Sequence, residues 1–271
     1  MKFGICNEIF KDWSLEDTFA FAKKAGYDQV EIAPFTLAKY VTDITPAERS
    51  RIRELAARIG IGISGLHWVL VQAEGMYLTH TDPAVREKTA AYFVALVDCC
   101  ADLGGTRIVV GSPKQRNLLE GVTYEQAWKW ATDVFRPAVK RAEERGVVLC
   151  FEPLAPSETN FINTAEEGRR FAAQFESRAM SIILDVKAMS SEAAPVPQTI
   201  RESAGKFEYV HANDPNLKGP GFGEMDFVPI AAALRDAGYD GTVSVEVFNF
   251  DEGPEVIATK SREYLRKAFG C

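Results

Sequence analysis

Short runs of apolar residues alternate along the whole chain with longer segments whose apolar residues recur at helical spacing. Each short run is almost continuously apolar, which is typical of a parallel strand that is buried on both faces. The candidate strands are Lys2–Cys6, Gln29–Ile32, Ile61–Leu66, Arg107–Val110, Val147–Phe151, Ser181–Leu184, Glu208–His211 and Val243–Val247. The pattern therefore predicts a chain built from successive βα units.

The segments between the predicted strands carry the signals of helix ends. Thr45, Thr123 and Thr164 each stand three residues before a Glu or Gln, which is the capping-box pattern of a helix N-terminus. Gly60 and Gly146 each stand between a helical segment and the next strand, where glycine readily adopts a left-handed conformation. These signals indicate where the predicted helices begin and end.

Alternating βα units form either a closed barrel or an open, doubly wound sheet. A dinucleotide-binding sheet requires a GxGxxG loop after its first strand, but residues 7–13 contain no glycine. No linker or change in composition divides the chain. We therefore expect one domain over residues 1–271, a (β/α)8 or TIM barrel of normal length for that fold.

Four successive predicted strands lead to a side chain that is able to bind a metal. The fifth strand is followed by Glu152 and the sixth by Asp185. The seventh strand ends at His211, and the eighth contains Glu246. In a barrel these strand ends are neighbours on one rim, where three carboxylates repel one another unless a cation, shared protons or basic partners compensate. With a histidine among them, we interpret the four residues as ligands of one divalent metal ion.

The donor types narrow the choice of ion. Three carboxylates and one imidazole favour an ion that prefers oxygen ligands over one that prefers sulfur. We expect Mn²⁺ first, with Mg²⁺, Co²⁺ and Zn²⁺ as alternatives.

Composition and charge exclude several classes of partner. The net charge is −7 and no basic run or stripe is present, which argues against a nucleic-acid partner. No apolar run approaches the length of about 18 residues that a membrane-spanning helix requires. None of the five cysteines forms a CxxC pair, and residues 2–6 are predicted as a strand rather than a leader. We expect a cytoplasmic protein.

Several motifs are similar to those of one known family. They are Phe151-Glu-Pro153, Leu184-Asp185, His211-Ala-Asn-Asp214, Gly219–Gly223 followed by Asp226-Phe227, and Val245-Glu246. The resemblance covers essentially the whole chain, which is similar to the xylose isomerase-like superfamily of sugar isomerases and epimerases. Within that superfamily it resembles most the ketose 3-epimerase branch, whose members act on tagatose and psicose.

The resemblance implies a metal-dependent epimerase or isomerase of a ketose or keto-sugar-like carbohydrate. In such enzymes the reaction passes through a cis-enediolate, and two glutamates transfer the proton. The matching residues are Glu152 and Glu246, while Glu158 matches a glutamate that binds substrate hydroxyls. Relatives of this kind are often oligomers, which implies a homodimer or a homotetramer.

Two positions depart from the pattern of those epimerases. They carry a second histidine three residues after the metal-binding aspartate, where this chain has Ala188. They also carry an arginine shortly after the His-x-Asn-Asp motif, where this chain has Leu217. Lys187 and Lys218 are candidate replacements that face the pocket and bind an anionic or differently shaped substrate, or else they are solvated loop lysines.

Other candidate substrate contacts follow the early strands. His67 follows the third strand and lies either in the pocket or in the packed core. Glu31, near the end of the second strand, either contacts substrate or supports other site residues. Trp13 and Phe10 follow the first strand, and they stack on a sugar, cap the barrel or form a subunit contact.

Three other functions remain as alternatives. An inosose or 3-keto-sugar dehydratase or lyase on the same metal-binding barrel also begins with removal of a proton next to a carbonyl. A DNA-repair nuclease of this barrel type uses a histidine-rich trinuclear zinc cluster, and the three histidines of this chain are too few for one. A non-catalytic binding barrel is disfavoured by the retained pair of Glu152 and Glu246.

Overall fold

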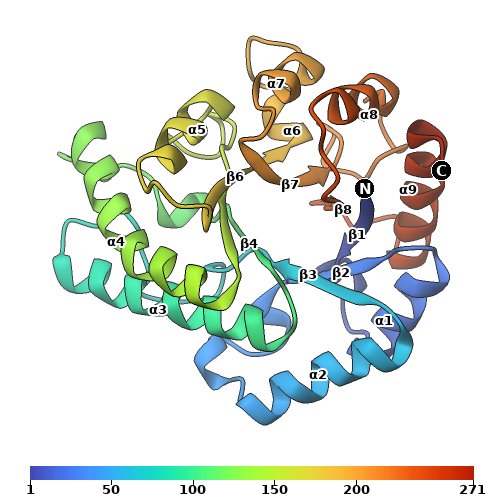
Figure 1. The fold of residues 1–271 in the computed structure, drawn as a ribbon, viewed down its shortest axis with the longest axis horizontal. Coiled ribbons are helices and arrows are strands. Elements are labelled where there is room, and N and C mark those ends of the chain that lie inside the picture. Colours follow the sequence, from blue (N-terminus) through green and yellow to red (C-terminus); the bar gives the residue numbers. More distant parts are fainter.

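The chain forms a closed barrel of parallel strands inside a ring of helices (Figure 1). The computed structural model describes residues 1–271. Around the barrel, in sequence order, lie β1 (Lys2–Cys6), β2 (Gln29–Ile32), β3 (Gly62–Leu66), β4 (Arg107–Val110), β5 (Val148–Phe151), β6 (Met180–Asp185), β7 (Phe207–Ala212) and β8 (Thr242–Val245). Strand β8 pairs in parallel with β1 and closes the sheet. The predicted (β/α)8 barrel is confirmed.

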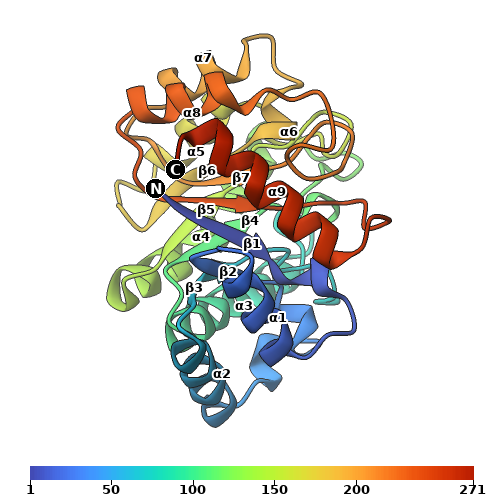
Figure 2. The ribbon, with the colours of Figure 1, turned by 90° about the vertical axis from the view of Figure 1, so that its right-hand side faces the viewer.

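The helices cover the outside of the barrel, as the second view also shows (Figure 2). They are α1 (Leu15–Lys24), α2 (Pro46–Ile59), α3 (Pro83–Asp102), α4 (Tyr124–Arg145), α5 (Ala165–Ala173), α6 (Val186–Met189), α7 (Val196–Glu202), α8 (Phe227–Asp236) and α9 (Pro254–Phe269). The single-turn helix α6 begins directly after β6. None of the helices combines the length and the apolar character that a membrane crossing requires.

The predicted helix ends are present, but only one of the three predicted capping boxes forms in full. At Thr123 both halves of the capping box form, and α4 ends on Gly146 in the left-handed conformation with φ of 66°. At Thr45 the hydroxyl accepts a hydrogen bond from the Glu48 amide, but the reciprocal bond does not form. The Glu48 carboxylate instead lies 3.7 Å from the guanidinium of Arg51.

The barrel interior explains how side chains reach the rim. Val109, Cys150, Ile183 and Tyr209 form a small buried cluster contributed by strands β4, β5, β6 and β7. Because side chains alternate along a strand, the residue two positions after Cys150 faces inward again, and that residue is Glu152. Cys150 therefore lies deeper in the barrel as packing, in agreement with its buried environment.

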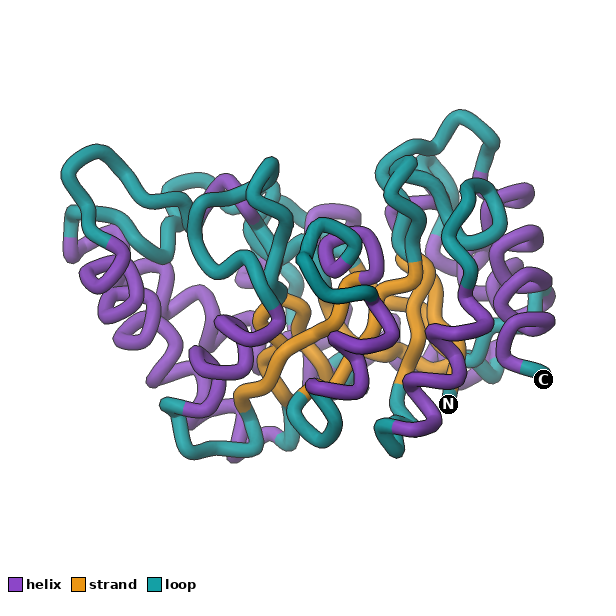
Figure 3. Tube along the Cα trace, turned by 90° about the horizontal axis from the view of Figure 1, so that it is seen from above, coloured by secondary structure: helices purple, strands orange, loops and turns teal.

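The longer loops gather on one side of the barrel (Figure 3). They include residues 67–82 between β3 and α3, residues 152–164 between β5 and α5, and residues 213–226 between β7 and α8. These segments leave the carboxyl ends of the strands, where barrels of this kind build their functional sites. The fold thus places the candidate residues at the floor of a mouth formed by these loops.

Candidate metal centre

The structure brings the four predicted ligands together at the carboxyl ends of β5 to β8. One ligand atom from each of Glu152, Asp185, His211 and Glu246 lies within 4.8 Å of those of the other three. All four side chains are buried, with at most 6% of the residue surface exposed. The cluster contains three carboxylates and one imidazole, as the strand ends predicted.

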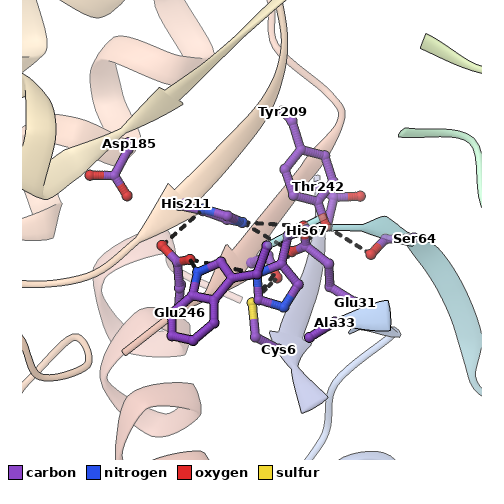
Figure 4. Close-up of polar contacts among 12 residues, drawn as sticks. Cys6, Glu31, Ala33, Ser64, His67, Asp185, Tyr209, His211, Thr242 and Glu246 are labelled. Carbon is purple, nitrogen blue, oxygen red and sulfur yellow. Dashed lines mark hydrogen bonds and ion pairs between the residues drawn. The ribbon is translucent and has the colours of Figure 1, made fainter. Parts of the chain in front are cut away.

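His211 lies between two carboxylates, one on each side of its ring (Figure 4). Its Nε2 atom lies 3.1 Å from Oε2 of Glu31, which is buried below it at the end of β2. Its Nδ1 atom lies 3.1 Å from Oε2 of Glu246 and 3.7 Å from Oε1 of Glu152. Nδ1 makes no hydrogen bond, so its lone pair is available to a metal when Nε2 carries the ring proton.

A second set of polar side chains lies directly beneath this cluster. Cys6, Glu31, His67 and His211 also have ligand atoms within 4.8 Å of one another. Glu31 accepts hydrogen bonds from the Tyr209 hydroxyl at 3.0 Å and from the Cys6 thiol at 3.5 Å. Because Glu31 already has these donors as well as His211, we interpret this layer as support that fixes the orientation of the His211 ring.

Asp185 is oriented by the start of α6 and by a residue of the loop after β7. Its Oδ1 atom accepts a hydrogen bond from the Ala188 amide at 2.6 Å, so Asp185 caps this short helix. Its Oδ2 atom accepts from the Asn213 side-chain amide at 2.5 Å. The Oδ1 atom of Asn213 in turn accepts from the Lys187 amide at 2.8 Å, which joins β6, α6 and β7 around the carboxylate.

Burial and mutual repulsion make the cluster electrostatically unusual. Burial raises the pKa of Glu152, and burial together with Glu152 and Glu246 raises the pKa of Asp185 to about 7. Burial also opposes the charged form of Glu246, but His211 and His67 outweigh it and lower the pKa of this carboxyl. Three carboxyl groups are therefore crowded at a desolvated site, where a bound cation would stabilise their charged forms.

Glu246 has further partners that sequence reasoning did not identify. Its Oε1 atom accepts a hydrogen bond from the Trp68 indole N–H at 2.8 Å and lies 3.5 Å from Nδ1 of His67. The Nε2 atom of His67 lies 2.9 Å from the buried carboxylate of Glu8. Glu8 lies in the 3-10 turn Asn7–Phe10 after β1, and no spacing in the sequence links it to a residue after β3.

A cavity of about 430 Å³ lies over the cluster, on the side of β3 to β5. Its lining includes Glu152, Glu246 and Glu158, and the aromatic residues Trp68 and Phe248. Lys187 borders it, because its Nζ atom lies 2.7 Å from Oε1 of Glu158 and 4.4 Å from the centre of the Phe248 ring. The other Glu158 carboxylate oxygen is buried and has no hydrogen-bond partner.

The remaining sequence candidates lie elsewhere. Glu31 and His67 are buried beneath the cluster and do not line the cavity. Lys218 pairs with Glu252 at 2.7 Å, and Trp13 packs against Phe10 with ring centres 5.4 Å apart. Neither Lys218 nor Trp13 reaches the cavity lining.

Leu217, at the position where the resemblance implied an arginine, points its side chain outward and is 45% exposed. Its backbone is left-handed, with φ of 71°. Its carbonyl oxygen accepts hydrogen bonds from the backbone amides of Phe248 and Asn249, each at 2.9 Å. The residue therefore supports the loop that carries Phe248.

The four residues fit a divalent ion on structural grounds. The unpaired Nδ1 of His211 points toward two carboxylates, and a third carboxylate completes a compact buried set of donors. The backbone also makes room for them, because a Cβ atom at Gly111 would lie only 2.1 Å from Oε2 of Glu152. The buried Glu/Asp/His cluster is therefore consistent with a divalent metal site.

Comparison with known proteins places this arrangement in a family. A family model described as Xylose isomerase-like TIM barrel matches residues 19–268. A D-psicose 3-epimerase of Enterocloster bolteae is 33% identical, and the alignment covers 93% of this chain and 84% of that protein. A 3-dehydro-D-guloside 4-epimerase of Escherichia coli is 24% identical, with 98% and 99% covered.

Similarity to solved structures supports the same fold. A crystal structure of D-psicose 3-epimerase with D-tagatose, from Clostridium cellulolyticum H10, superimposes with a TM-score of 0.85. The two chains are 24% identical, and each is covered completely. With the family model, the relatives and the barrel in agreement, the chain belongs to the xylose isomerase-like TIM barrel family.

Proposed function

We propose that this protein is a metal-dependent epimerase of a ketose or keto-sugar, in which Glu152 and Glu246 transfer the proton. The observation that carries the proposal is that both glutamates belong to the buried donor cluster and both line the cavity above it. They come from different strand ends, β5 and β8, and are therefore placed to act on a bound substrate from different sides. The curated relatives with similar chains are named as sugar epimerases.

Glu152, Asp185, His211 and Glu246 would hold the ion, and their oxygen-rich set favours Mn²⁺ over ions that prefer sulfur. When bound there, the ion supplies Lewis-acid polarisation of the substrate carbonyl and so acidifies the adjacent C–H bond. Glu31 holds the His211 ring, while Asn213 and the Ala188 amide hold Asp185.

The proton transfer itself uses the two glutamates. One carboxylate removes the proton from the carbon next to the carbonyl, and the electron pair of the C–H bond forms a planar cis-enediolate. The other glutamate, starting as the carboxylic acid, returns a proton to the opposite face of that carbon. After one turnover the two glutamates have exchanged protonation states, so atoms and charge balance across the inversion.

Residues of the cavity provide contacts for a sugar. Trp68 and Phe248 line the cavity and offer apolar surface to the C–H groups of a sugar. The unpaired oxygen of Glu158 is able to accept a hydrogen bond from a substrate hydroxyl. Lys187 beside it is able to donate a hydrogen bond to an oxygen or an anionic group of the substrate. We therefore place Glu158 and Lys187 among the substrate-binding residues.

The decisive experiment incubates the Mn²⁺-loaded protein with a panel of ketoses and 3-keto-glycosides in deuterated water. We expect one deuterium atom at the inverted carbon of the product, since the returned proton comes from a glutamate that exchanges with solvent. Loss of water with formation of an enone chromophore would instead identify a dehydratase.

Glu152→Gln and Glu246→Gln should each abolish inversion, because each removes one of the two proton carriers. Glu143→Gln, at an exposed position on α4, is the matched control and should retain it. Full inversion by either of the two site variants, or inversion without deuterium in the product, would contradict the proposed mechanism.

A further inference from the structure

Trp68 has a backbone conformation that is unusual for a large side chain. It lies just beyond the end of β3 and has a positive φ of 50°. A bulky residue in this left-handed region is strained, and such strain persists only where the surroundings hold the residue firmly. Residues of this kind concentrate at functional sites, and Trp68 lines the cavity over the donor cluster of Glu152, Asp185, His211 and Glu246.

Two other aromatic rings stack on the indole ring. Phe35 stacks on it with ring centres 6.0 Å apart and planes inclined by 25°. Phe248 stacks with ring centres 6.0 Å apart and planes inclined by 24°. The three rings come from loops after β2, β3 and β8, so the stack ties separate parts of the barrel mouth together and fixes the direction of the indole N–H.

That N–H is directed at one particular oxygen of Glu246. It donates to Oε1 at 2.8 Å, while the other oxygen, Oε2, lies 3.1 Å from Nδ1 of His211. Oε2 also lies 3.5 Å from the side-chain nitrogen of Asn213. The two oxygens therefore have different surroundings, with Oε1 held by Trp68 and Oε2 turned toward the donor cluster.

We propose that Trp68 is a positioning residue that sets the orientation of the Glu246 carboxylate and thereby supports proton transfer by this glutamate. This inference rests on the proposed function for its kinetic consequence, but the hydrogen bond itself is open to a separate test. Trp68 makes no hydrogen bond to Glu152. Its removal should therefore affect one of the two proton carriers and leave the other in place.

The hydrogen bond is tested in solution without any substrate. Protein labelled with ¹⁵N-tryptophan and loaded with diamagnetic Mg²⁺ should give four indole N–H signals, one for each tryptophan. The signal missing in Trp68→Phe belongs to Trp68, and we expect Glu246→Gln to move it more than the other three. A Trp68 signal that does not respond to Glu246→Gln would overturn the inference.

The kinetic consequence is tested with the same Trp68→Phe variant, which retains an aromatic ring but removes the N–H donor together with part of the indole. We expect kcat for inversion to fall on the order of tenfold to a hundredfold, as for the loss of one hydrogen bond to a charged group. KM should change much less. For the epimer whose proton Glu152 removes, exchange of that proton with deuterated solvent should persist while inversion falls.

Trp130→Phe is the matched control, because it makes the same substitution at a tryptophan on α4 that does not line the cavity. It should keep the wild-type ratio of exchange to inversion. If Trp68→Phe inverts substrate at the wild-type rate, or lowers exchange and inversion in parallel, Trp68 has no positioning role. If the wild-type protein exchanges no deuterium with any ketose, the proposed function fails, and the indole signal still decides whether Trp68 holds Glu246.

Discussion

At the scale of single residues, the surroundings of His211 suit the role of a metal ligand that we propose for it. Its Nε2 atom faces Glu31, which also accepts hydrogen bonds from Tyr209 and Cys6. This arrangement favours the tautomer with the proton on Nε2 and leaves Nδ1 free toward Glu246. Glu31 therefore acts on the donor cluster through His211, although it lies below the cavity.

The pKa shifts predict how pH affects metal binding. Burial, Glu152 and Glu246 raise the pKa of Asp185 to about 7. Burial lowers the pKa of His211, but Glu246 and Glu31 outweigh it and raise this pKa well above its usual value. Below these pKa values the groups are protonated and must release a proton to bind an ion, so metal affinity should fall as the pH falls from about 8 to about 6.

Calorimetric titration with Mn²⁺ across this pH range checks the prediction. Repeating the titration in buffers with different ionisation heats counts the protons that are released on binding. A constant affinity with no proton release would show that the donors are already deprotonated in the metal-free protein.

The residues predictable from sequence lie at strand ends, whereas those that were missed depend on contacts between distant parts of the chain. Glu152, Asp185 and His211 share a property that a sequence shows, because each lies at or next to the end of a predicted strand. The contact from Trp68 to Glu246 depends on a left-handed backbone and a stack of three rings, which no local pattern encodes. Trp13, a candidate for sugar stacking, a barrel cap or a subunit contact, packs against Phe10 and does not line the cavity.

At the scale of elements, the junction after β4 makes room for a carboxylate from β5. Gly111 follows β4 directly, and a Cβ atom there would lie 2.1 Å from Oε2 of Glu152. Gly111→Ala should therefore displace the Glu152 carboxylate and lower Mn²⁺ affinity by about tenfold or more, the range found when the support of a ligand is lost.

Gly121→Ala is the control for this variant, because Gly121 has open space around its Cβ position but a left-handed φ of 76°. It should lower thermal stability through backbone strain and leave Mn²⁺ affinity unchanged. Calorimetry and thermal unfolding on both variants separate the two effects. Normal affinity in Gly111→Ala would mean that Glu152 binds the ion from a different position.

The elements themselves were largely predictable from sequence. β1, β2 and β4 have the predicted bounds, and the other strands differ by one or two residues. Strand β8 ends at Val245, so Glu246 follows the strand rather than lying within it. The capping box at Thr123 forms in full because its Gln126 side chain is free to bond back, whereas Glu48 at the similar Thr45 box pairs with Arg51.

At the scale of the whole molecule, the closed barrel brings side chains that are far apart in the sequence close together in space. The donors are spread from Glu152 to Glu246, yet the parallel order of β5 to β8 brings their ligand atoms within 4.8 Å. This convergence is predictable from sequence because the fold is regular. The exact lining of the cavity is not predictable in this way, since it depends on the packing of long segments after β3 and β5.

The proposed function requires that the four converging donors form one metal site, and a metal-content measurement tests this most directly. Metal-free protein is equilibrated with Mn²⁺, desalted and analysed for bound metal, alongside Asp185→Asn. This variant removes a charged ligand, while asparagine is still able to cap α6. We predict one ion per chain in the wild-type protein. The thermal unfolding temperature should also rise when metal is added, since a ligand at about 100 times its Kd adds about 2.7 kcal/mol to the free energy of unfolding.

Asp185→Asn should lose both the bound ion and the thermal shift while remaining folded. An ion in the wild-type protein that disappears with this single substitution would confirm the donor cluster as the metal site. No bound metal in the wild-type protein, or equal amounts in wild type and variant, would contradict the account.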